Sequence, residues 1–446
     1  MLMVCRIIIL ALYAAVAAAD PVGKSHLQHM HLLFRHGDRT PISTFPLDGH
    51  PFDTTWPEGP GQLTQLGIEQ QYLLGTWIRE NYANFIPRQY NASTFYMRST
   101  DVDRTLTSAL ANLAGLFRHS NSSLEKYGIH WRPIPIHTVQ QTSEIMFAAA
   151  PCPRFHQILE ESYKSEVTKA FLDKHKSLFD LLRNVTGWPK LGVDKLWIVE
   201  DELICLEAHN FSLPEWYTPA FKEELAIVAE YLWKLQYSDT ERRRLELGVF
   251  LNDMIEHMDR VINPNISSSR PALSSAINGG LTSPKVMAYS AHDENVAALL
   301  AALGVYDNET KPEYTSLVLV ELHGPQPPAD PAAYSIRVRY KRNWQDSTGE
   351  YLKLPACSIA ATPSEGCEYK KVVEYLQPML LRPEDFESAC RLKLYSSGSF
   401  FLFVGIAAFG LLLVLSGLVS FVCIVVYRRR QHSHYQPFSS DDDLAC

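Results

Sequence analysis

The apolar positions of the chain fall into two patterns, short continuous runs and longer stretches with a helical period. Short continuous runs are typical of buried strands, whereas apolar residues that recur every three or four positions indicate helices that bury one face. The runs predict five strands, at Met30–Phe34, Phe95–Arg98, Lys285–Ala291, Leu317–Leu322 and Ala333–Tyr340.

The helical period predicts three helices beside these strands, at Thr64–Asn81, Asp101–Phe117 and Glu294–Leu303. In the first two, the apolar residues expected to face the core are Leu66, Leu73, Trp77, Val102, Leu106, Leu110, Leu113 and Phe117. Strands that alternate with helices are typical of an α/β fold. We therefore expect a central mixed sheet flanked by helices.

A long stretch from about residue 151 to about residue 276 has mostly helical periods and contains none of the predicted strands. It predicts a helical insertion into the α/β core, whose own residues are about 27–117 and 280–390. The chain is long enough to bury a sizeable core.

Two apolar segments stand near the ends of the chain. Residues 1–19 have a basic start, a short apolar centre and small residues before Asp20, which predicts a secretory signal peptide. Residues 400–427 contain no charged residue and exceed the roughly 20 residues that cross a bilayer. Three arginines follow at 428–430, and basic residues stay in the cytoplasm. We therefore expect a type I single-pass protein with residues 20–395 in the lumen or outside the cell and a cytoplasmic tail at 428–446.

The predicted lumenal part carries further marks of a secretory protein. Its asparagine glycosylation motifs are at Asn91, Asn121, Asn184, Asn210, Asn265 and Asn308. Its cysteines are Cys152, Cys205, Cys357, Cys367 and Cys390. Most should form disulfides in an oxidising compartment, and an odd number leaves at least one unpaired. The net charge of −8 and the absence of a basic stripe give no support to nucleic-acid binding.

Histidines and arginines stand where predicted strands end. Arg35-His36-Gly37-Asp38-Arg39 follows the first strand, Arg98 ends the second, and His292-Asp293 follows the third. An open α/β sheet presents its chemistry at the carboxyl ends of its strands. Guanidinium groups suit phosphate oxygens and a neutral imidazole is a nucleophile, so this set favours attack on a phosphoryl group. The alternatives are a surface loop at Arg35–Arg39, a helix cap at Asp293 and a core histidine at His292.

These motifs resemble those of the histidine acid phosphatases, a branch of the histidine phosphatase superfamily, over roughly residues 27–390. The resemblance implies that His36 is the nucleophile and carries a phosphohistidine intermediate. It implies that Asp293 protonates the leaving alcohol, and that the phosphate oxygens are held by Arg35, Arg39, Arg98 and His292. We expect no metal or other cofactor, because no ligand motif such as H-E-x-x-H is present. Arg104 is expected to fix its helix rather than to contact substrate.

The resemblance also implies a disulfide between Cys152 and Cys390, which leaves Cys357 and Cys367, close in sequence, to pair with each other. In the family, the counterpart of Cys205 pairs with a strand cysteine whose position here is Leu317. We therefore expect Cys205 to be a buried free thiol without a reactive role.

The expected function is that of a membrane-anchored acid phosphatase that hydrolyses phosphate monoesters. The alternatives are a narrower phosphatase for inositol polyphosphates or lysophosphatidate, and a non-catalytic type I receptor. The tail residues Tyr435 and Phe438 fit the Y-x-x-hydrophobic pattern that endocytic adaptors bind. They favour the endosomal and lysosomal membrane, with the plasma membrane as the alternative. A homodimer is what the family resemblance suggests.

Overall fold

The computed structural model describes residues 25–147, 152–264, 284–306, 310–357, 362, 364–393 and 398–432. The chain divides into two compact units, Met1–Arg391 and Leu392–Cys446. The expected signal peptide, the tail motif and two glycosylation motifs, at Asn265 and Asn308, lie outside the described residues.

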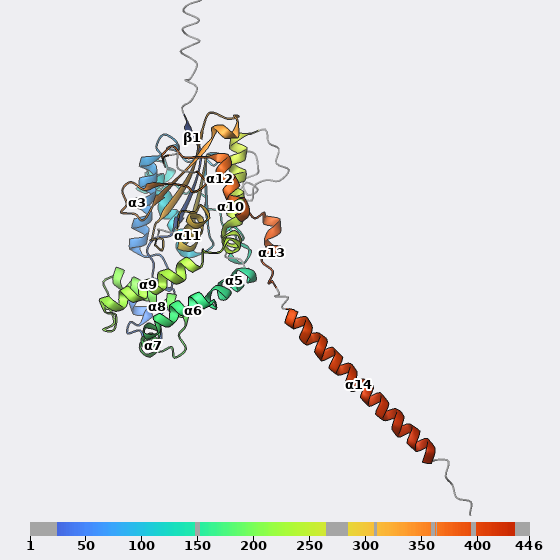
Figure 1. Cartoon of the computed structure of the whole chain (residues 1–446). Coiled ribbons are helices and arrows are strands. Elements are labelled where there is room, and N and C mark those ends of the chain that lie inside the picture. Colours follow the sequence, from blue (N-terminus) through green and yellow to red (C-terminus); the bar gives the residue numbers. More distant parts are fainter. Residues whose placement is uncertain are drawn as a thin grey trace, which may run out of the picture. The chain divides into compact units, whose positions relative to one another are not determined.

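A mixed sheet forms the centre of the first unit, with strand order β2-β3-β1-β4-β5-β6 and β7 paired to β5 (Figure 1). Its strands are β1 (His26–Arg35), β2 (Phe95–Ser99), β3 (Val286–Ala291), β4 (Leu317–Gly324), β5 (Ser335–Lys341), β6 (Glu350–Leu352) and β7 (Cys367–Glu368). All five strands predicted from the apolar runs are present, and the mixed sheet is confirmed.

The three strands that precede the candidate residues run parallel to one another. Arg35 at the end of β1 lies beside Ala291 at the end of β3, and Ser99 at the end of β2 lies beside Ser290. The Arg35–Arg39 segment and the His292-Asp293 pair therefore leave the sheet at one edge, next to each other.

Two pairs of helices cover the two faces of the sheet. α3 (Gln65–Asn81) and α4 (Asp103–Leu116) pack on one face, where the core includes Phe34. α10 (Thr240–Ile262) and α11 (Asp293–Ala302) pack on the other, and both contact β1. The range predicted for the insertion included α10, but this helix belongs to the core because its long apolar face covers the sheet.

The buried faces of α3 and α4 differ from those that apolar spacing predicts. Leu66, Leu73 and Trp77 are only half-buried, and Leu110 is exposed. The inward residues are instead small or polar in large part, namely Gly67, Gln70, Gln71, Leu74, Gly75, Ile78, Arg79, Thr105, Ser108, Ala109, Asn112, Leu113, Gly115 and Leu116. Their polar members hold the backbone of the Arg35–Arg39 segment: Gln70 accepts from the Asp38 N–H at 2.8 Å, and Gln71 donates to the Arg35 carbonyl at 2.7 Å.

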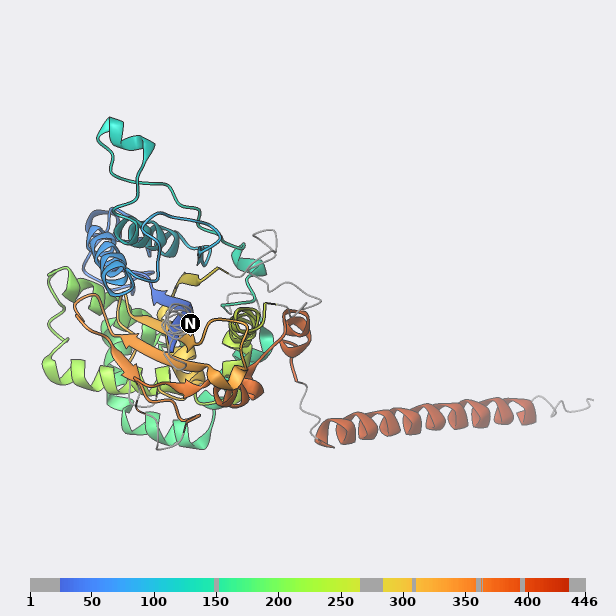
Figure 2. The same cartoon turned by 90° about the horizontal axis from the view of Figure 1, so that it is seen from above.

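The helical insertion lies at one end of the sheet (Figure 1). Its helices are α5 (Pro153–Tyr163), α6 (Glu166–Lys174), α7 (Lys176–Val185), α8 (Val193–Ala208) and α9 (Pro219–Leu235). Leucines and aromatic residues of α7, α8 and α9 form a separate apolar core. Short helices elsewhere in the unit are α2 (Phe52–Thr55), α12 (Tyr369–Leu376) and α13 (Phe386–Ala389), and Figure 2 shows the same arrangement from above.

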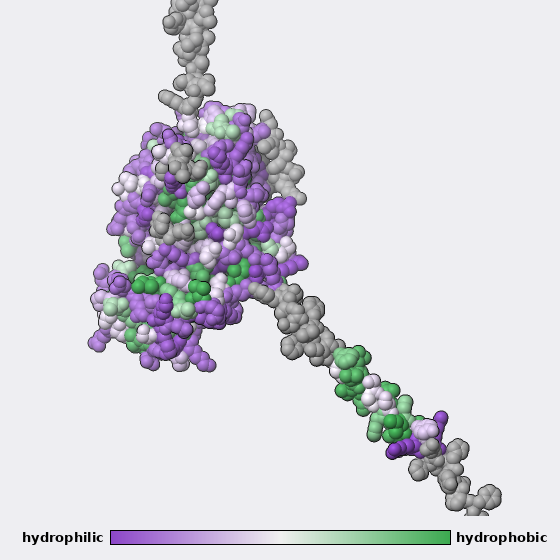
Figure 3. Space-filling view, viewed as in Figure 1, coloured by the Kyte–Doolittle hydropathy of each residue, from purple (hydrophilic) through white to green (hydrophobic). Residues whose placement is uncertain are grey.

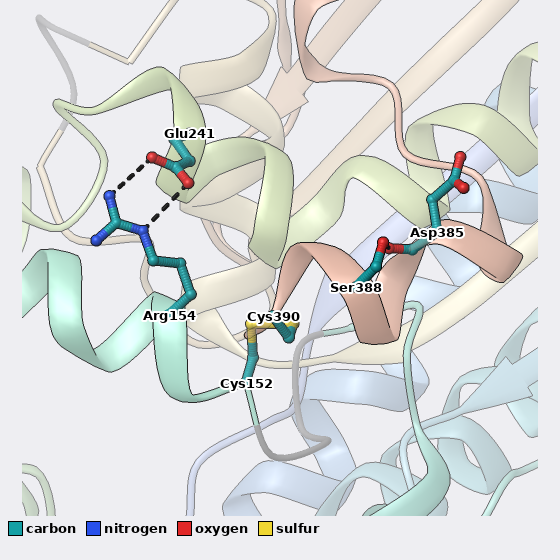
Figure 4. The surroundings of a disulfide bond; sticks show 6 residues. All are labelled: Cys152, Arg154, Glu241, Asp385, Ser388 and Cys390. Atoms are coloured by element: carbon teal, nitrogen blue, oxygen red, sulfur yellow. Dashed lines mark hydrogen bonds and ion pairs between the residues drawn. A yellow bond between two sulfur atoms is a disulfide. The ribbon is translucent and has the colours of Figure 1, made fainter. Parts of the chain in front are cut away.

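Two disulfides have the pairing expected from the sequence. Cys152–Cys390 joins the start of α5 to the end of α13, across 238 residues of sequence, and beside it Arg154 donates two hydrogen bonds to Glu241 of α10 (Figure 4). Cys357–Cys367 closes a short loop. Cys205 is a buried free thiol, as expected.

The second unit contains one long helix, α14 (Gly398–His432), which carries the apolar surface visible in Figure 3. Within it, Phe409–Arg430 has a mean hydropathy of 2.8 and is long and apolar enough to cross a membrane. Among the described residues this is the one candidate span, and it overlaps the predicted segment at 400–427.

Candidate active site

His36 directly follows β1, and its imidazole is almost completely buried. Nδ1 lies 2.8 Å from the Gly37 carbonyl oxygen, which can only accept a hydrogen bond, so Nδ1 carries the proton. Nε2 is then the nitrogen with a free lone pair. The hydrogen bond fixes both the tautomer and the ring orientation that a nucleophilic imidazole needs.

The surroundings of His36 keep its imidazole neutral. Burial is the largest cause that moves the pKa of His36 well below its ordinary value of 6.5, because the charged form loses its hydration. The neighbouring cations Arg104, Arg35 and Arg39 lower this pKa further. The His36 imidazole therefore stays unprotonated in acid, where an ordinary histidine is charged.

Two of the arginines around His36 are held by carboxylates. Arg35 pairs with Asp293 at 2.9 Å and donates to the Pro312 carbonyl at 2.7 Å. Arg39 forms two hydrogen bonds with Asp201, at 2.9 and 2.7 Å. The Nε atoms of both arginines are buried and have no hydrogen-bond partner among the described residues, which leaves donors for an anion.

The third arginine at the site is Arg104, in the first turn of α4. Its Nη2 donates to Nδ1 of His292 at 3.4 Å, so Nε2 of His292 carries the proton and donates to Thr100 at 2.9 Å. Burial, followed by repulsion from Arg39, lowers the pKa of Arg104 to about 10, and it remains a cation in acid. Burial and Arg104 also lower the pKa of His292, to about 3.

Arg98 does not belong to this group. Its guanidinium is buried and pairs with Glu144 at 2.6 Å, on the face of the sheet that carries Phe147. Arg104, by contrast, lowers the pKa of both His36 and His292 and donates a hydrogen bond to His292. The structure thus brings Arg104, rather than Arg98, beside His36 and His292, because residue 98 pairs with Glu144 at the strand end and α4 brings residue 104 back to the sheet edge.

Asp293 is the first residue of α11 and lies 2.9 Å from Arg35. Burial alone would raise the pKa of Asp293, but the attraction of Arg35, Lys311 and Arg39 outweighs it and holds this pKa below its ordinary value. In the unliganded site Asp293 is a carboxylate. An anion that binds beside Arg35 would offset part of the positive charge and make protonation of Asp293 easier.

A cavity of about 450 Å³ extends from His36 to the helical insertion. The core contributes His36, Arg39, Arg104, His292 and Asp293 to its wall, and the remaining wall comes in large part from α5, α8 and α9. The arrangement can bind a small tetrahedral anion against three guanidiniums and two imidazoles and present Nε2 of His36 to it.

Sequence reasoning found the two motifs at the sheet edge and missed the residues that orient them. From the sequence, Arg104 is expected to fix its helix, although it lies close to Arg98 in the same segment. Asp201 comes from the distant insertion, and no local pattern marks it as a partner of Arg39. Thr100 follows β2 directly, so its position at a strand end was an available indication.

The fold and the site define a class of protein. The chain matches the model of the histidine phosphatase superfamily (branch 2) over residues 26–340, and it belongs to this family. It is similar in fold to the apo form of Hafnia alvei phytase, with a TM-score of 0.57, 18% identity, and coverage of 84% of this chain and 100% of that one.

Among characterised relatives, the chain is similar to acid phosphatases. It is 33% identical over 390 residues to the lysosomal acid phosphatase of Xenopus laevis, covering 86% of this chain and 83% of the relative. It is 36% identical over 377 residues to the prostatic acid phosphatase of Bos taurus, covering 83% and 89%. The family expected from the Arg35–Arg39 and His292-Asp293 motifs is thus confirmed.

The two arginines can be distinguished by the binding of inorganic phosphate. Arg104→Met removes a charge-assisted donor, each of which contributes about 1.5–3 kcal/mol, so phosphate affinity should fall at least tenfold. As a control, Arg98→Met/Glu144→Gln removes both charges of the buried pair and should leave the affinity within about twofold. Isothermal titration calorimetry of the full-length protein in detergent measures both. If the control variant bound phosphate more weakly and Arg104→Met bound it as the wild type does, Arg98 rather than Arg104 would be the arginine at the anion site.

Proposed function

We propose that this chain is an acid phosphatase that hydrolyses phosphate monoesters through a phosphohistidine at His36. The observation that carries the proposal is a neutral imidazole with a free Nε2, buried among Arg35, Arg39 and Arg104. The family membership and the acid phosphatase relatives support it. A non-catalytic receptor would have no need for a buried nucleophile in a cluster of cations.

In the first step, Nε2 of His36 attacks phosphorus as the bond to the ester oxygen breaks. The ester oxygen takes the bonding electrons and a proton from Asp293, and leaves as the alcohol. The charge on the phosphoryl oxygens is stabilised by the three arginines and by the N–H groups of the site.

In the second step, water attacks the phosphohistidine while the Asp293 carboxylate takes its proton. The N–P bond breaks, its electron pair returns to Nε2, and inorganic phosphate leaves. Arg35 and its neighbours keep Asp293 a carboxylate in the empty site, so acid favours this cycle by supplying the proton that Asp293 passes to the leaving alcohol, while His36 stays neutral. A phosphate ester loses its second proton near pH ~6, so the substrate monoanion that dominates in acid also brings a proton into the site.

The wall of the cavity beyond the arginines favours an apolar leaving group. Trp197, Trp233 and Tyr163 line it together with leucines of α5, α8 and α9. Away from the arginines, the acidic lining residues Asp194 and Glu200 outnumber the basic residue Lys311, and their charge would repel additional phosphate groups. We therefore prefer aryl or acyl-chain phosphate monoesters over inositol polyphosphates, although the structural relatives include phytases.

For the cellular location, we propose the membrane of endosomes and lysosomes. The lysosomal relatives, the candidate span at Phe409–Arg430 and the tail motif at Tyr435 support this, with the catalytic unit in the lumen. The described glycosylation motifs are at exposed asparagines, namely Asn91, Asn121, Asn184 and Asn210, as attachment of glycans would require. The plasma membrane remains the second proposed location.

A homodimer is proposed on the family resemblance and on an apolar arm. The segment around residues 120–132 projects from the first unit in Figure 2 and exposes Tyr127, Ile129 and Trp131. Exposed apolar residues that cluster in this way are typical of protein interfaces. Sedimentation of the full-length protein in detergent, compared with a Trp131→Glu variant, tests whether this arm joins two copies.

The intermediate is tested by trapping. Wild-type protein mixed with a radiolabelled aryl phosphate at acidic pH and then denatured should retain acid-labile label on the peptide that contains His36. His36→Gln preserves a polar side chain but has no nucleophilic nitrogen, so it should carry no label and lose activity by at least a thousandfold. Label or near-normal turnover in this variant would exclude His36 as the nucleophile.

Substrate preference is tested by comparing an aryl phosphate with inositol hexakisphosphate at acidic pH. The acidic residues of the outer cavity should give the aryl ester at least a tenfold larger kcat/KM. Asp194→Asn should reduce the difference in kcat/KM between the two substrates, because it removes one repulsive charge from the cavity. Asp173→Asn serves as the control, because Asp173 is on α6 and does not line the cavity. Faster turnover of the polyphosphate by the wild-type protein would favour the narrower inositol phosphatase.

The tail motif is tested by surface labelling of cells. Tyr435→Ala should increase the fraction of the protein at the plasma membrane severalfold, because adaptor binding to this type of motif requires the tyrosine ring. Tyr427→Ala, at the end of the predicted span, is the control. If surface biotinylation of Tyr435→Ala equals that of the wild type, another feature determines the location.

A further inference from the structure

One face of α8 contacts the Arg35–Arg39 segment at three successive turns. Asp201, Cys205 and His209 are spaced by four residues, so they lie on the same side of the helix and its carboxyl end. The Asp201 carboxylate accepts two hydrogen bonds from Arg39. The Cys205 thiol donates to the Arg39 carbonyl at 3.5 Å, and Nε2 of His209 lies 2.7 Å from the Asp38 carboxylate.

We propose that this face of α8 positions the Arg35–Arg39 segment, which contains His36, and that Asp201 is the positioning residue for Arg39. On this account the helical insertion sets the geometry of the phosphate site in addition to forming the substrate cavity. The proposal rests on the proposed function, since it assigns a role within the same site.

The fork between Asp201 and Arg39 leaves a defined donor for phosphate. It occupies both terminal nitrogens of the guanidinium, and Nε has no partner among the described residues. Both side chains are buried, and Arg39 lines the cavity. A planar two-point pair fixes the plane of the guanidinium, whereas a free arginine side chain has several rotatable bonds to order when it binds.

Asp201 also offsets the repulsion between Arg39 and the neighbouring arginines. Arg39 lies close enough to Arg104 and Arg35 for the three cations to repel one another. In an empty site this repulsion would turn Arg39 away from His36. The Asp201 carboxylate compensates the charge of Arg39 through its two hydrogen bonds to the terminal nitrogens of the guanidinium. It accepts a further hydrogen bond from the Ile42 N–H at 3.2 Å, which ties it to the chain after the segment.

The remainder of the segment is clamped between α8 and α3. The Asp38 carboxylate accepts from His209 and, at 2.5 Å, from the Thr64 hydroxyl at the start of α3. On the α3 side, an added Cβ at Gly67 would lie 2.1 Å from the Asp38 carbonyl oxygen, so the contact is as close as glycine allows. His36 is therefore fixed from two directions by its neighbours.

The thiol of Cys205 can act as the hydrogen-bond donor to the Arg39 carbonyl. Burial, and then the negative charge of Asp201, raise the pKa of Cys205 far above its ordinary value, so the thiol keeps its proton. The buried free thiol thus forms part of the contact between α8 and the Arg35–Arg39 segment.

The test compares Asp201→Asn with Glu207→Gln in the full-length protein. Glu207 lies on the outer face of α8 and pairs with Lys222, so its variant controls for changes to the helix. Asp201→Asn should weaken phosphate binding, measured by calorimetry, at least tenfold and raise KM for an aryl phosphate similarly. Glu207→Gln should leave both within twofold. Unchanged phosphate binding by Asp201→Asn would overturn the proposal.

Three further variants distinguish a positioning role of Asp201 from an effect on the stability of the fold. Arg39→Met/Asp201→Asn should bind phosphate no more weakly than Arg39→Met alone, because Asp201 acts only through Arg39; additive losses would contradict this. Should Asp201→Asn fail to fold, Asp201→Glu keeps the charge but displaces the fork by one methylene. The Asp201→Glu variant should melt near the wild-type temperature and still bind phosphate more weakly than the wild type. Wild-type phosphate affinity in this variant would overturn the proposal. Because calorimetry needs no turnover, it remains informative even if the phosphatase activity itself is not found.

Discussion

The site depends on holding three positively charged guanidinium groups around one imidazole, that of His36, which must stay uncharged. Arg35, Arg39 and Arg104 repel one another, and together with burial they hold the His36 imidazole neutral. This arrangement of three arginines is costly without an anion between them, and carboxylates that pair with two of the arginines compensate for it. Asp293 does this for Arg35 and Asp201 for Arg39, one from the core and one from the insertion.

The fold makes that charge arrangement possible. Parallel β1, β2 and β3 end at one edge, so segments that are far apart in sequence leave the sheet side by side. The helices beside that edge then differ in what they supply. α4 brings Arg104, α11 begins with Asp293, and α8 reaches across from the insertion to hold the segment after β1. The cavity at His36 thus lies between two parts of one compact unit, and both contribute residues to its wall.

Several features could be predicted from the sequence: the strands, the mixed sheet, the two motifs and the disulfide pairing. The strands and motifs have local sequence patterns, and the disulfide pairing follows from the family resemblance. The sequence pattern misplaced the buried faces of α3 and α4, since Gln70, Gln71 and Gly67 face inward to hold a backbone and apolar spacing does not count them. It also favoured Arg98 for phosphate binding, whereas the structure brings Arg104 beside His36 and His292. Which of two nearby arginines turns toward His36 depends on Glu144, whose pairing with Arg98 is a long-range contact.

The central claim is that His36 remains a neutral nucleophile in acid, and its titration tests this most directly. In full-length protein labelled with ¹⁵N-histidine and kept in detergent without phosphate, the resonances of His36 are assigned with the His36→Gln variant. Their chemical shifts should stay those of a neutral imidazole, protonated at Nδ1, from about pH 7 down to about pH 4, because burial and the arginines lower its pKa. A transition to the imidazolium with a midpoint near the ordinary value of 6.5 would contradict the account.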